Sequence, residues 1–245
     1  MRHSTWTGLR LKGNLPVRFA VVMVMAVVLS AGIIGGLMKA GAQTRPENKQ
    51  CFDQTGRCVA GEFLVYFLQN GGVATFGYPI GSQVNVHNSV TGRTYPIQWF
   101  QYARFESHSE QPVPYKVLLG KLGEETLRGK KIDWRTLPTA SGPKAGCMWF
   151  SESKHNLCDQ ATGAGFKTYW RTYGLKDTRM SAYSRSLMRF GYPLTEATME
   201  VNSEGKQVLT QWFQRARLEW LPDQPASLMV RETPLSAPLV RPSER

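Results

Sequence analysis

The stretch Phe76-Gly77-Tyr78-Pro79-Ile80 decides the fold, because it occurs again as Phe190-Gly191-Tyr192-Pro193-Leu194. A second stretch, QWFQYARFE at residues 98–106, occurs again as QWFQRARLE at residues 211–219. The copies lie 114 residues apart for the first motif and 113 residues apart for the second. Motifs that recur in the same order at nearly the same spacing indicate an internal duplication.

Aromatic residues with helical spacing precede each copy, and the two sets lie 103 residues apart. They are Phe63, Tyr66 and Phe67 in the first copy and Phe166, Tyr169 and Trp170 in the second. Spacing of i, i+3 and i+4 predicts a short helix, and the glycine that follows predicts where it ends. The rise in spacing from 103 to 114 predicts an insertion of about ten residues between Gly174 and Phe190, which we expect to be a surface loop.

Each helix is followed by a segment that predicts a β-hairpin. We expect Val73–Phe76 to be extended and Gly-Tyr-Pro to form a turn, with strands at residues 95–106 and 208–220. The predicted fold class is α+β, with two repeated small units, each a short helix plus a β-hairpin, stapled by disulfides.

The predicted strand has two faces, because successive side chains alternate. One face is largely apolar and should pack on the helix; the other mixes aromatic and polar side chains. Flat rings beside arginine can stack on sugar rings and bind their hydroxyl groups, whereas the plainer reading is a half-buried strand with an Arg–Glu pair. The candidate ligand-binding residues are Phe100, Tyr102 and Arg104, with Phe213, Arg215 and Arg217 in the second copy.

Composition changes along the chain predict its organisation. We expect a signal peptide or membrane anchor at 1–42, the first repeat unit at 51–127 and the second at 147–235. Residues 128–146, with Pro138, Gly142 and Pro143, read as a linker. Residues 236–245, which include Pro238 and Pro242, read as a disordered tail.

The four cysteines form one pair at the start of each copy. The duplication favours disulfides Cys51–Cys58 and Cys147–Cys158, each local to its own unit. A zinc site is the alternative, because His155 lies between Cys147 and Cys158, but the first copy has no such histidine. We therefore expect no metal and no cofactor.

The N-terminus carries an export signal. Basic residues precede twenty uncharged residues, 19–38, which as a helix of about 30 Å would span a bilayer core. Ala40-Gly41-Ala42 is a candidate cleavage site before Gln43. A cleaved signal and a retained N-terminal hydrophobic helix both remain open, and both predict an extracytoplasmic protein, secreted or anchored to the cytoplasmic membrane.

The net charge of the part predicted to be exported restricts the classes of partner that it could bind. Residues 43–245 carry 25 basic and 18 acidic side chains, a net charge of +7. This charge suits an anionic surface polymer, but no concentrated basic stripe marks a nucleic-acid partner. Solvated surface charge is the plainer interpretation.

These motifs resemble the LGFP-type repeat of exported bacterial envelope proteins. The resemblance rests on the aromatic helix, the Phe-Gly-Tyr-Pro turn, the opening Cys51-Phe52 and the ending Val117-Leu118-Leu119-Gly120. The chain has Phe76 and Phe190 where the family motif has leucine. The resemblance implies cell-wall attachment and polysaccharide binding.

No sequence motif indicates an enzyme. HExxH, GxSxG, Walker A and GxGxxG patterns are absent from the sequence. Glu106 and Glu219 could suggest a glycosidase pair, but the duplication makes them equivalent residues of two units. We therefore expect a non-enzymatic envelope protein that binds cell-wall polysaccharide or an anionic surface polymer, and the alternative is a structural subunit of a surface protein assembly.

Overall fold

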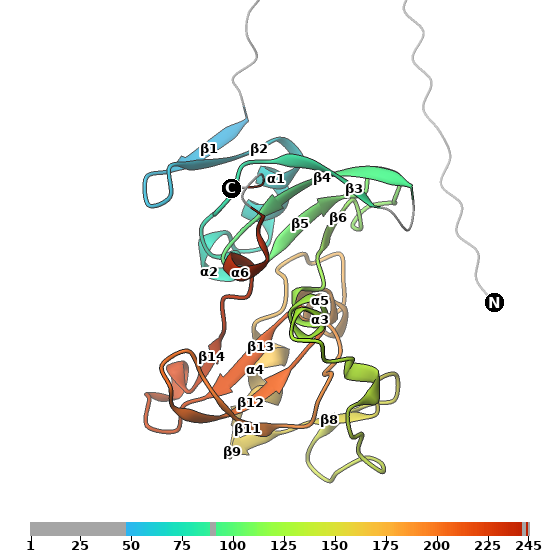
Figure 1. The fold of residues 1–245 in the computed structure, drawn as a ribbon, viewed down its shortest axis with the longest axis vertical. Coiled ribbons are helices and arrows are strands. Elements are labelled where there is room, and N and C mark those ends of the chain that lie inside the picture. Colours follow the sequence, from blue (N-terminus) through green and yellow to red (C-terminus); the bar gives the residue numbers. More distant parts are fainter. Residues whose placement is uncertain (1–47, 89–91, 242–243, 245) are drawn as a thin grey trace, which may run out of the picture. The chain divides into compact units, whose positions relative to one another are not determined.

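Two four-stranded antiparallel sheets form the framework of the chain (Figure 1). The structure, a computed structural model, describes residues 48–88, 92–241 and 244, all within one compact unit. The predicted leader at 1–42, with its apolar segment 19–38, lies outside the described residues.

The helices and strands fall into a first half, residues 48–129, and a second half, residues 147–232. The first half contains β1 (Lys49–Phe52), β2 (Arg57–Ala60), α1 (Gly61–Gln69), α2 (Val73–Phe76), β3 (Val84–Asn88), β4 (Arg93–Trp99), β5 (Arg104–Ser107), β6 (Val117–Leu119) and α3 (Leu122–Gly129). The second half contains β7 (Met148–Phe150), β8 (His155–Leu157), β9 (Asp159–Ala161), β10 (Ala164–Gly165), α4 (Phe166–Thr172), α5 (Ala182–Phe190), β11 (Thr198–Val201), β12 (Gln207–Trp212), β13 (Arg217–Trp220) and β14 (Val230–Glu232). Two short 3-10 helices, Trp134–Thr136 and Ala226–Leu228, and the C-terminal α6 (Ser236–Leu239) complete the described elements.

The strands of each sheet follow the order of the sequence. One sheet has the order β3-β4-β5-β6 and the other β11-β12-β13-β14, and all neighbours are antiparallel. Small two-stranded sheets and short helices accompany them. The α+β class predicted from the sequence is confirmed.

Both predicted disulfides are present, Cys51–Cys58 and Cys147–Cys158. Each closes a small β-hairpin, β1-β2 or β7-β8. A buried glutamine ties each hairpin to the neighbouring sheet: Gln98 Nε2 donates to the Cys58 carbonyl at 2.8 Å, and Gln211 Nε2 to the Asn156 carbonyl at 2.9 Å. The disulfides therefore fix hairpins that are also hydrogen-bonded to the main framework.

The predicted strands 95–106 and 208–220 are wrong, because the chain reverses in the middle of each. Trp99 pairs with Arg104 across a tight turn, and the Phe100 N–H donates to the Ala103 carbonyl at 2.7 Å. The second half has the same turn, with Trp212 opposite Arg217. Neither turn contains the Gly, Asn, Asp or Pro that usually marks a turn. The sequence therefore predicted one continuous strand, and alternation across the turn assigned side chains to the wrong faces of that strand.

The Gly-Tyr segment of each motif is hydrogen-bonded to this turn and fixes its conformation. Gln101 N–H donates to the Tyr78 carbonyl at 3.1 Å, and its side-chain oxygen accepts from the Tyr78 N–H at 3.0 Å. Gln214 and Tyr192 make the same two hydrogen bonds at 3.0 and 3.2 Å. We call these paired interactions the glutamine clamps.

Glycine is required between the phenylalanine and the tyrosine of each motif. Gly77 and Gly191 have φ of +72° and +78° with ψ of −172° and −169°, a region that is essentially restricted to glycine. A Cβ on either would lie 2.5 Å from the Cβ of the clamp glutamine. Backbone conformation and close packing therefore both exclude a side chain.

The segments before the clamps differ from the sequence prediction. Val73–Phe76 is the short helix α2 rather than an extended segment, because Gly72 reverses the chain and its carbonyl accepts from the Thr75 and Phe76 N–H groups. The insertion in the second half is not only a surface loop, since much of it is α5. Leu175, also in the insertion, is 1% exposed and packs in the apolar cluster of the first half.

The C-terminal segment is ordered where it is described, so the predicted disordered tail at 236–245 is wrong for 236–241 and 244. Residues 236–239 form α6, which lies among the elements of the first half in Figure 1. Val240 is 6% exposed, and the Trp99 indole N–H donates to Glu244 at 3.0 Å. Ser236 Oγ also donates to the Ala103 carbonyl.

The two halves share an apolar cluster, in addition to one cluster in each half. The shared cluster joins residues of both halves to the C-terminal segment. Its buried members are Ile97, Trp99, Leu122, Leu127, Leu194, Trp212, Leu235 and Val240. Helix α3, which crosses the predicted unit boundary at residue 127, supplies two of them. The described halves are therefore packed together rather than separated by a free linker.

Replacing Gly191 with alanine should destabilise the protein by about 3 kcal/mol or more, because strained backbone and a steric clash add. Gly205→Ala is the matched control, since Gly205 has a φ of +76° but a Cβ added to it would meet no described atom within 4 Å. We expect it to cost about 1 kcal/mol. Urea unfolding of both variants measures the difference. Equal losses would show that the clamp does not constrain this position.

Candidate functional site

The phenylalanines predicted to contact a ligand lie in the apolar core. Phe100 and Phe213 are both 0% exposed. Phe100 stacks on Phe67 with ring centroids 5.4 Å apart, and its ring centroid lies 4.2 Å from that of Phe105. A ring without exposed surface cannot stack on a sugar, so these two residues are withdrawn from the candidate site.

Tyr102 and Arg215, also predicted to bind a ligand, lie at the contact between the halves. Arg215 Nε donates to the Leu119 carbonyl of the first half at 2.9 Å, and burial lowers its pKa. Tyr102 is half-buried; burial raises its pKa, and the charge of Glu232 in the second half raises it further. These positions differ between the copies because each turn meets a different surface of the other half.

The remaining predicted residues, Arg104 and Arg217, each lie over a tryptophan. The Arg104 guanidinium carbon is 4.9 Å from the Trp99 ring centroid, and that of Arg217 is 5.4 Å from Trp212. This arrangement follows from the register of the hairpins, because each arginine is the cross-strand partner of its tryptophan. The two arginines differ in what surrounds them.

Arg104 lies between two carboxylates. It makes a bidentate ion pair with Glu125 of α3, with both N···O distances 2.7 Å. Its Nε also donates to Glu106 at 2.9 Å. Four donations from one guanidinium fix the orientation of both carboxylates.

A cleft of about 370 Å³ opens beside this cluster. Its lining comes from β3, β4, β5, α3 and the C-terminal segment. The residues are Val86, His87, Tyr95, Ile97, Trp99, Arg104, Glu106, Glu125, Leu239, Arg241 and Glu244. We call it the Arg104 cleft.

The corresponding region of the second half is more closed. Arg217 and Glu219 side chains are 7% and 2% exposed, against 16% and 23% for Arg104 and Glu106. Arg231 of β14 covers Glu219, with an N···O distance of 2.7 Å, and Glu200 of β11 pairs with Arg217 at 3.2 Å. A ligand therefore has more access to the cluster in the first half.

The Arg104 cleft is amphipathic. Val86, Ile97 and Leu239 supply apolar surface beside the ring of Tyr95, which packs against His108 with centroids 4.4 Å apart. Glu106 and Glu125 supply oriented hydrogen-bond acceptors. The lining holds three carboxylates and two guanidinium groups, so, with histidine neutral, its formal charge is −1.

Most of the cleft was not predictable from the repeated motifs. Glu125 belongs to α3, next to the residues read as a linker, and Leu239, Arg241 and Glu244 belong to the segment read as a tail. Tyr95 lies within a predicted strand, but the second half has no aromatic residue at the position 113 residues later, Val208. The only sequence feature that could have pointed to these cleft residues is that they have no counterpart in the other half.

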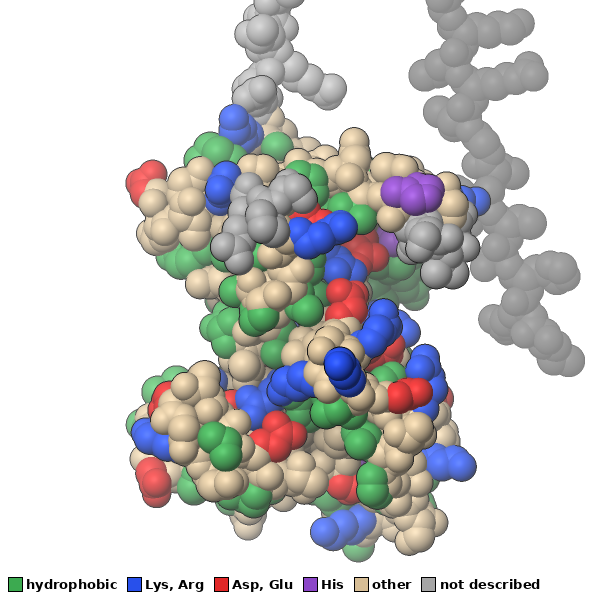
Figure 2. Space-filling model, viewed as in Figure 1, with side chains coloured by type: hydrophobic (Ala, Val, Ile, Leu, Met, Phe, Trp, Pro, Cys, Tyr) green, Lys and Arg blue, Asp and Glu red, His purple; other side chains and the backbone are tan. Residues whose placement is uncertain are grey.

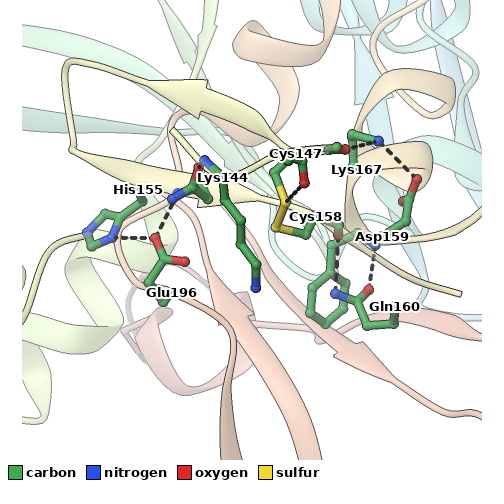
Figure 3. The surroundings of a disulfide bond; sticks show 12 residues. Lys144, Cys147, His155, Cys158, Asp159, Gln160, Lys167 and Glu196 are labelled. Carbon is green, nitrogen blue, oxygen red and sulfur yellow. Dashed lines mark hydrogen bonds and ion pairs between the residues drawn. A yellow bond between two sulfur atoms is a disulfide. The ribbon is translucent and has the colours of Figure 1, made fainter. Parts of the chain in front are cut away.

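His155 is the one described histidine that is buried, at 1% exposure. Figure 3 shows its ring directed toward Glu196, beside the Cys147–Cys158 disulfide, with Nδ1 3.4 Å from the nearer carboxylate oxygen. That oxygen also accepts from the Asn156 N–H at 2.7 Å. A ring this buried has no access to substrate, so we assign it a structural role. No group of three or more metal-ligating side chains occurs in residues 48–88, 92–241 and 244.

Comparison with models of protein families gave no match, and no curated protein matched the chain. The resemblance to LGFP-type repeats therefore remains a prediction from the motifs. Within the part of the chain that the structure describes, no helix combines the length and apolar character needed to cross a bilayer.

The stability of the protein should fall as the pH drops below about 6.5, in part because of His155. Burial lowers the pKa of His155 in the folded protein, and Glu196 only partly opposes this effect. The unfolded chain therefore takes up the proton first, which favours unfolding between the unfolded-state pKa and the lower folded-state pKa. Urea unfolding from pH 7.5 to 5 should give a flatter profile for His155→Gln. The exposed His87→Gln should keep the wild-type profile, and the prediction fails if both variants behave alike.

Proposed function

We propose that the chain is a non-enzymatic extracytoplasmic envelope protein, built from two copies of one LGFP-like module, that binds a neutral stretch of wall glycan in the Arg104 cleft. The observation that carries this proposal is the amphipathic lining of the cleft, which combines apolar side chains with carboxylates that Arg104 orients.

This lining fits the two kinds of surface on a sugar. The C–H faces of a pyranose ring pack on aromatic and aliphatic side chains, here Tyr95, Ile97 and Leu239. Sugar hydroxyl groups donate to carboxylates, and Arg104 holds Glu106 and Glu125 in place before a ligand arrives. Preorganised acceptors reduce the entropy lost on binding.

The charges favour a neutral sugar over a polyanion at this cleft. Its formal charge of −1 would repel a polyanion at short range, although the exported part is basic as a whole. Blue and red side chains are interspersed on the face drawn in Figure 2 rather than gathered into one basic field. The two disulfides support an oxidising, extracytoplasmic location, together with the predicted leader.

The full-length protein should sediment with the insoluble wall fraction of its host, and it should remain bound in 1 M NaCl. Glu125→Gln and Tyr95→Ala should each weaken this binding by about ten-fold, since a hydrogen bond to a charged group or a stacked ring contributes on that order. Glu110→Gln is the matched control, because Glu110 is an exposed acid outside the cleft lining. Release of reducing sugars should stay at the level of the blank.

Two results would contradict this proposal. One is full release from the wall fraction as salt shortens the Debye length from about 10 Å to 3 Å, which would mean that charge dominates. The other is unchanged binding in a folded Tyr95→Ala/Glu125→Gln double variant, with the melting temperature as the check on folding.

The second candidate function is that of a structural subunit in a surface protein assembly. It is favoured by apolar side chains on the outer face of α1, where Val65 is 42% and Leu68 57% exposed. Groups of exposed apolar residues mark protein contacts. Under this function a protein partner co-purifies with the chain, added polysaccharide does not displace it, and Leu68→Glu abolishes the association.

A further inference from the structure

A second cavity, larger than the Arg104 cleft, lies between α4 and α5 in the second half. Its volume is about 610 Å³. The lining residues are Met148, Thr168, Trp170, Arg171, Thr172, Ala182, Tyr183 and Ser186. None of them belongs to the strand motif from which the ligand-binding residues were predicted, and the buried Trp170 belongs to the predicted aromatic helix.

The insertion builds one wall of this cavity. Helix α5 has nine residues, whereas α2, which ends at the corresponding phenylalanine of the first half, has four. Ser181 caps α5, because its side chain accepts from the Ser184 N–H at 3.1 Å. Tyr183 and Ser186 are three residues apart on this helix and so project from one face. Helix α5 therefore adds a tyrosine and a serine that have no counterpart in α2.

Tyr183 supplies a supported and partly open aromatic ring. It is 45% exposed. Its ring is nearly parallel to that of Phe150, with centroids 6.3 Å apart, and lies 5.5 Å from Trp170. These contacts restrain the ring while much of its surface remains available for stacking, as recognition of a pyranose ring requires.

Ser186 supplies a buried hydroxyl group without a partner. The residue is 0% exposed, and its Oγ makes no hydrogen bond to any described residue. A buried polar atom without a partner is costly, so the wall of this cavity is not fully satisfied by the protein's own groups. Thr168 and Thr172 place further hydroxyl groups in the same lining.

Arg171 supplies the only charge in the lining, which contains no acidic residue. It is exposed, and no carboxylate of the described residues forms an ion pair with it. An unpaired guanidinium beside hydroxyl groups and an aromatic ring matches a sugar that carries a carboxylate. We propose that this cavity binds a sugar acid, with Tyr183 against the ring, Arg171 on the carboxylate and the exposed Thr172 on a hydroxyl group.

The first half lacks this chemistry at the corresponding positions. Leu68 stands 103 residues before Arg171, and Val65 stands 103 residues before Thr168. The site is therefore specific to the second half. It is also independent of the Arg104 cleft, which belongs to other elements and has the opposite formal charge.

A pair of monosaccharides that differ at one carbon tests the proposal. Methyl β-D-glucuronide carries a carboxylate where methyl β-D-glucoside carries a hydroxymethyl group. NMR titration of the full-length protein should show about ten-fold tighter binding of the glucuronide, because its carboxylate adds a charge-assisted hydrogen bond.

Variants assign this difference to the cavity. Arg171→Leu, which introduces the residue found in the first half, should remove the preference, and Arg171→Lys should retain part of it. Arg135→Leu is the control, since Arg135 is an exposed arginine outside this lining. Tyr183→Ala should weaken binding of both sugars at this cavity.

The two proposed sites can fail separately. The Tyr95→Ala/Glu125→Gln variant should keep its preference for the glucuronide although it no longer binds the neutral wall glycan. Equal binding of the two monosaccharides by the wild type would overturn the sugar-acid site. So would an unchanged preference in Arg171→Leu with wild-type melting temperature.

Discussion

The glutamine clamp is the interaction on which the rest of the structure depends. A turn that lacks Gly, Asn, Asp and Pro has no strong local preference to reverse, so its conformation must be imposed by another segment. Tyr78 and Gln101 exchange two hydrogen bonds, and Gly77 permits the close approach that these bonds require. Because the turn is fixed, the residues on either side of it are fixed too. Trp99 and Arg104 become cross-strand partners, and the charged cluster of the cleft is built on that register.

Both halves contain the same glutamine clamp, but the segments that surround the clamped turn differ between them. In the first half, α3 and the C-terminal segment approach the arginine and leave a cleft, whereas in the second half Arg231 and Glu200 close over the equivalent position. In the second half the insertion adds α5, which lines a cavity together with α4. A repeated framework thus carries two different surfaces, and the two proposed sites lie on these differences.

The sequence was sufficient for features that arise from local patterns. Helical spacing located the aromatic helix at α1, and the duplication selected the correct disulfide pairing. It was insufficient where a distant segment decides the outcome. The conformation of the turn after Trp99 depends on hydrogen bonds to Tyr78. The C-terminal segment with α6 is held in place because Val240 is buried. Two of the six candidate ligand-binding residues, Phe100 and Phe213, have no exposed surface. They recur because each half needs them in its core, so the repetition of a residue can reflect packing and not binding.

The electrostatics show why total charge is a weak guide to the ligand. Residues 43–245 carry a net charge of +7, which by itself favours an anionic polymer. Within the structure, most of the relevant cations are already neutralised: Arg104 by two glutamates and Arg189, at the contact between the halves, by the buried Glu232 at 2.8 Å. Burial raises the pKa of Glu232, while Arg189 opposes that rise. The charges that remain accessible are those of the two proposed sites. The cleft has one more carboxylate than guanidinium groups, and the cavity has one unpaired guanidinium. A polymer that alternates neutral and acidic sugars would satisfy both, whereas a uniform polyanion would satisfy only the second.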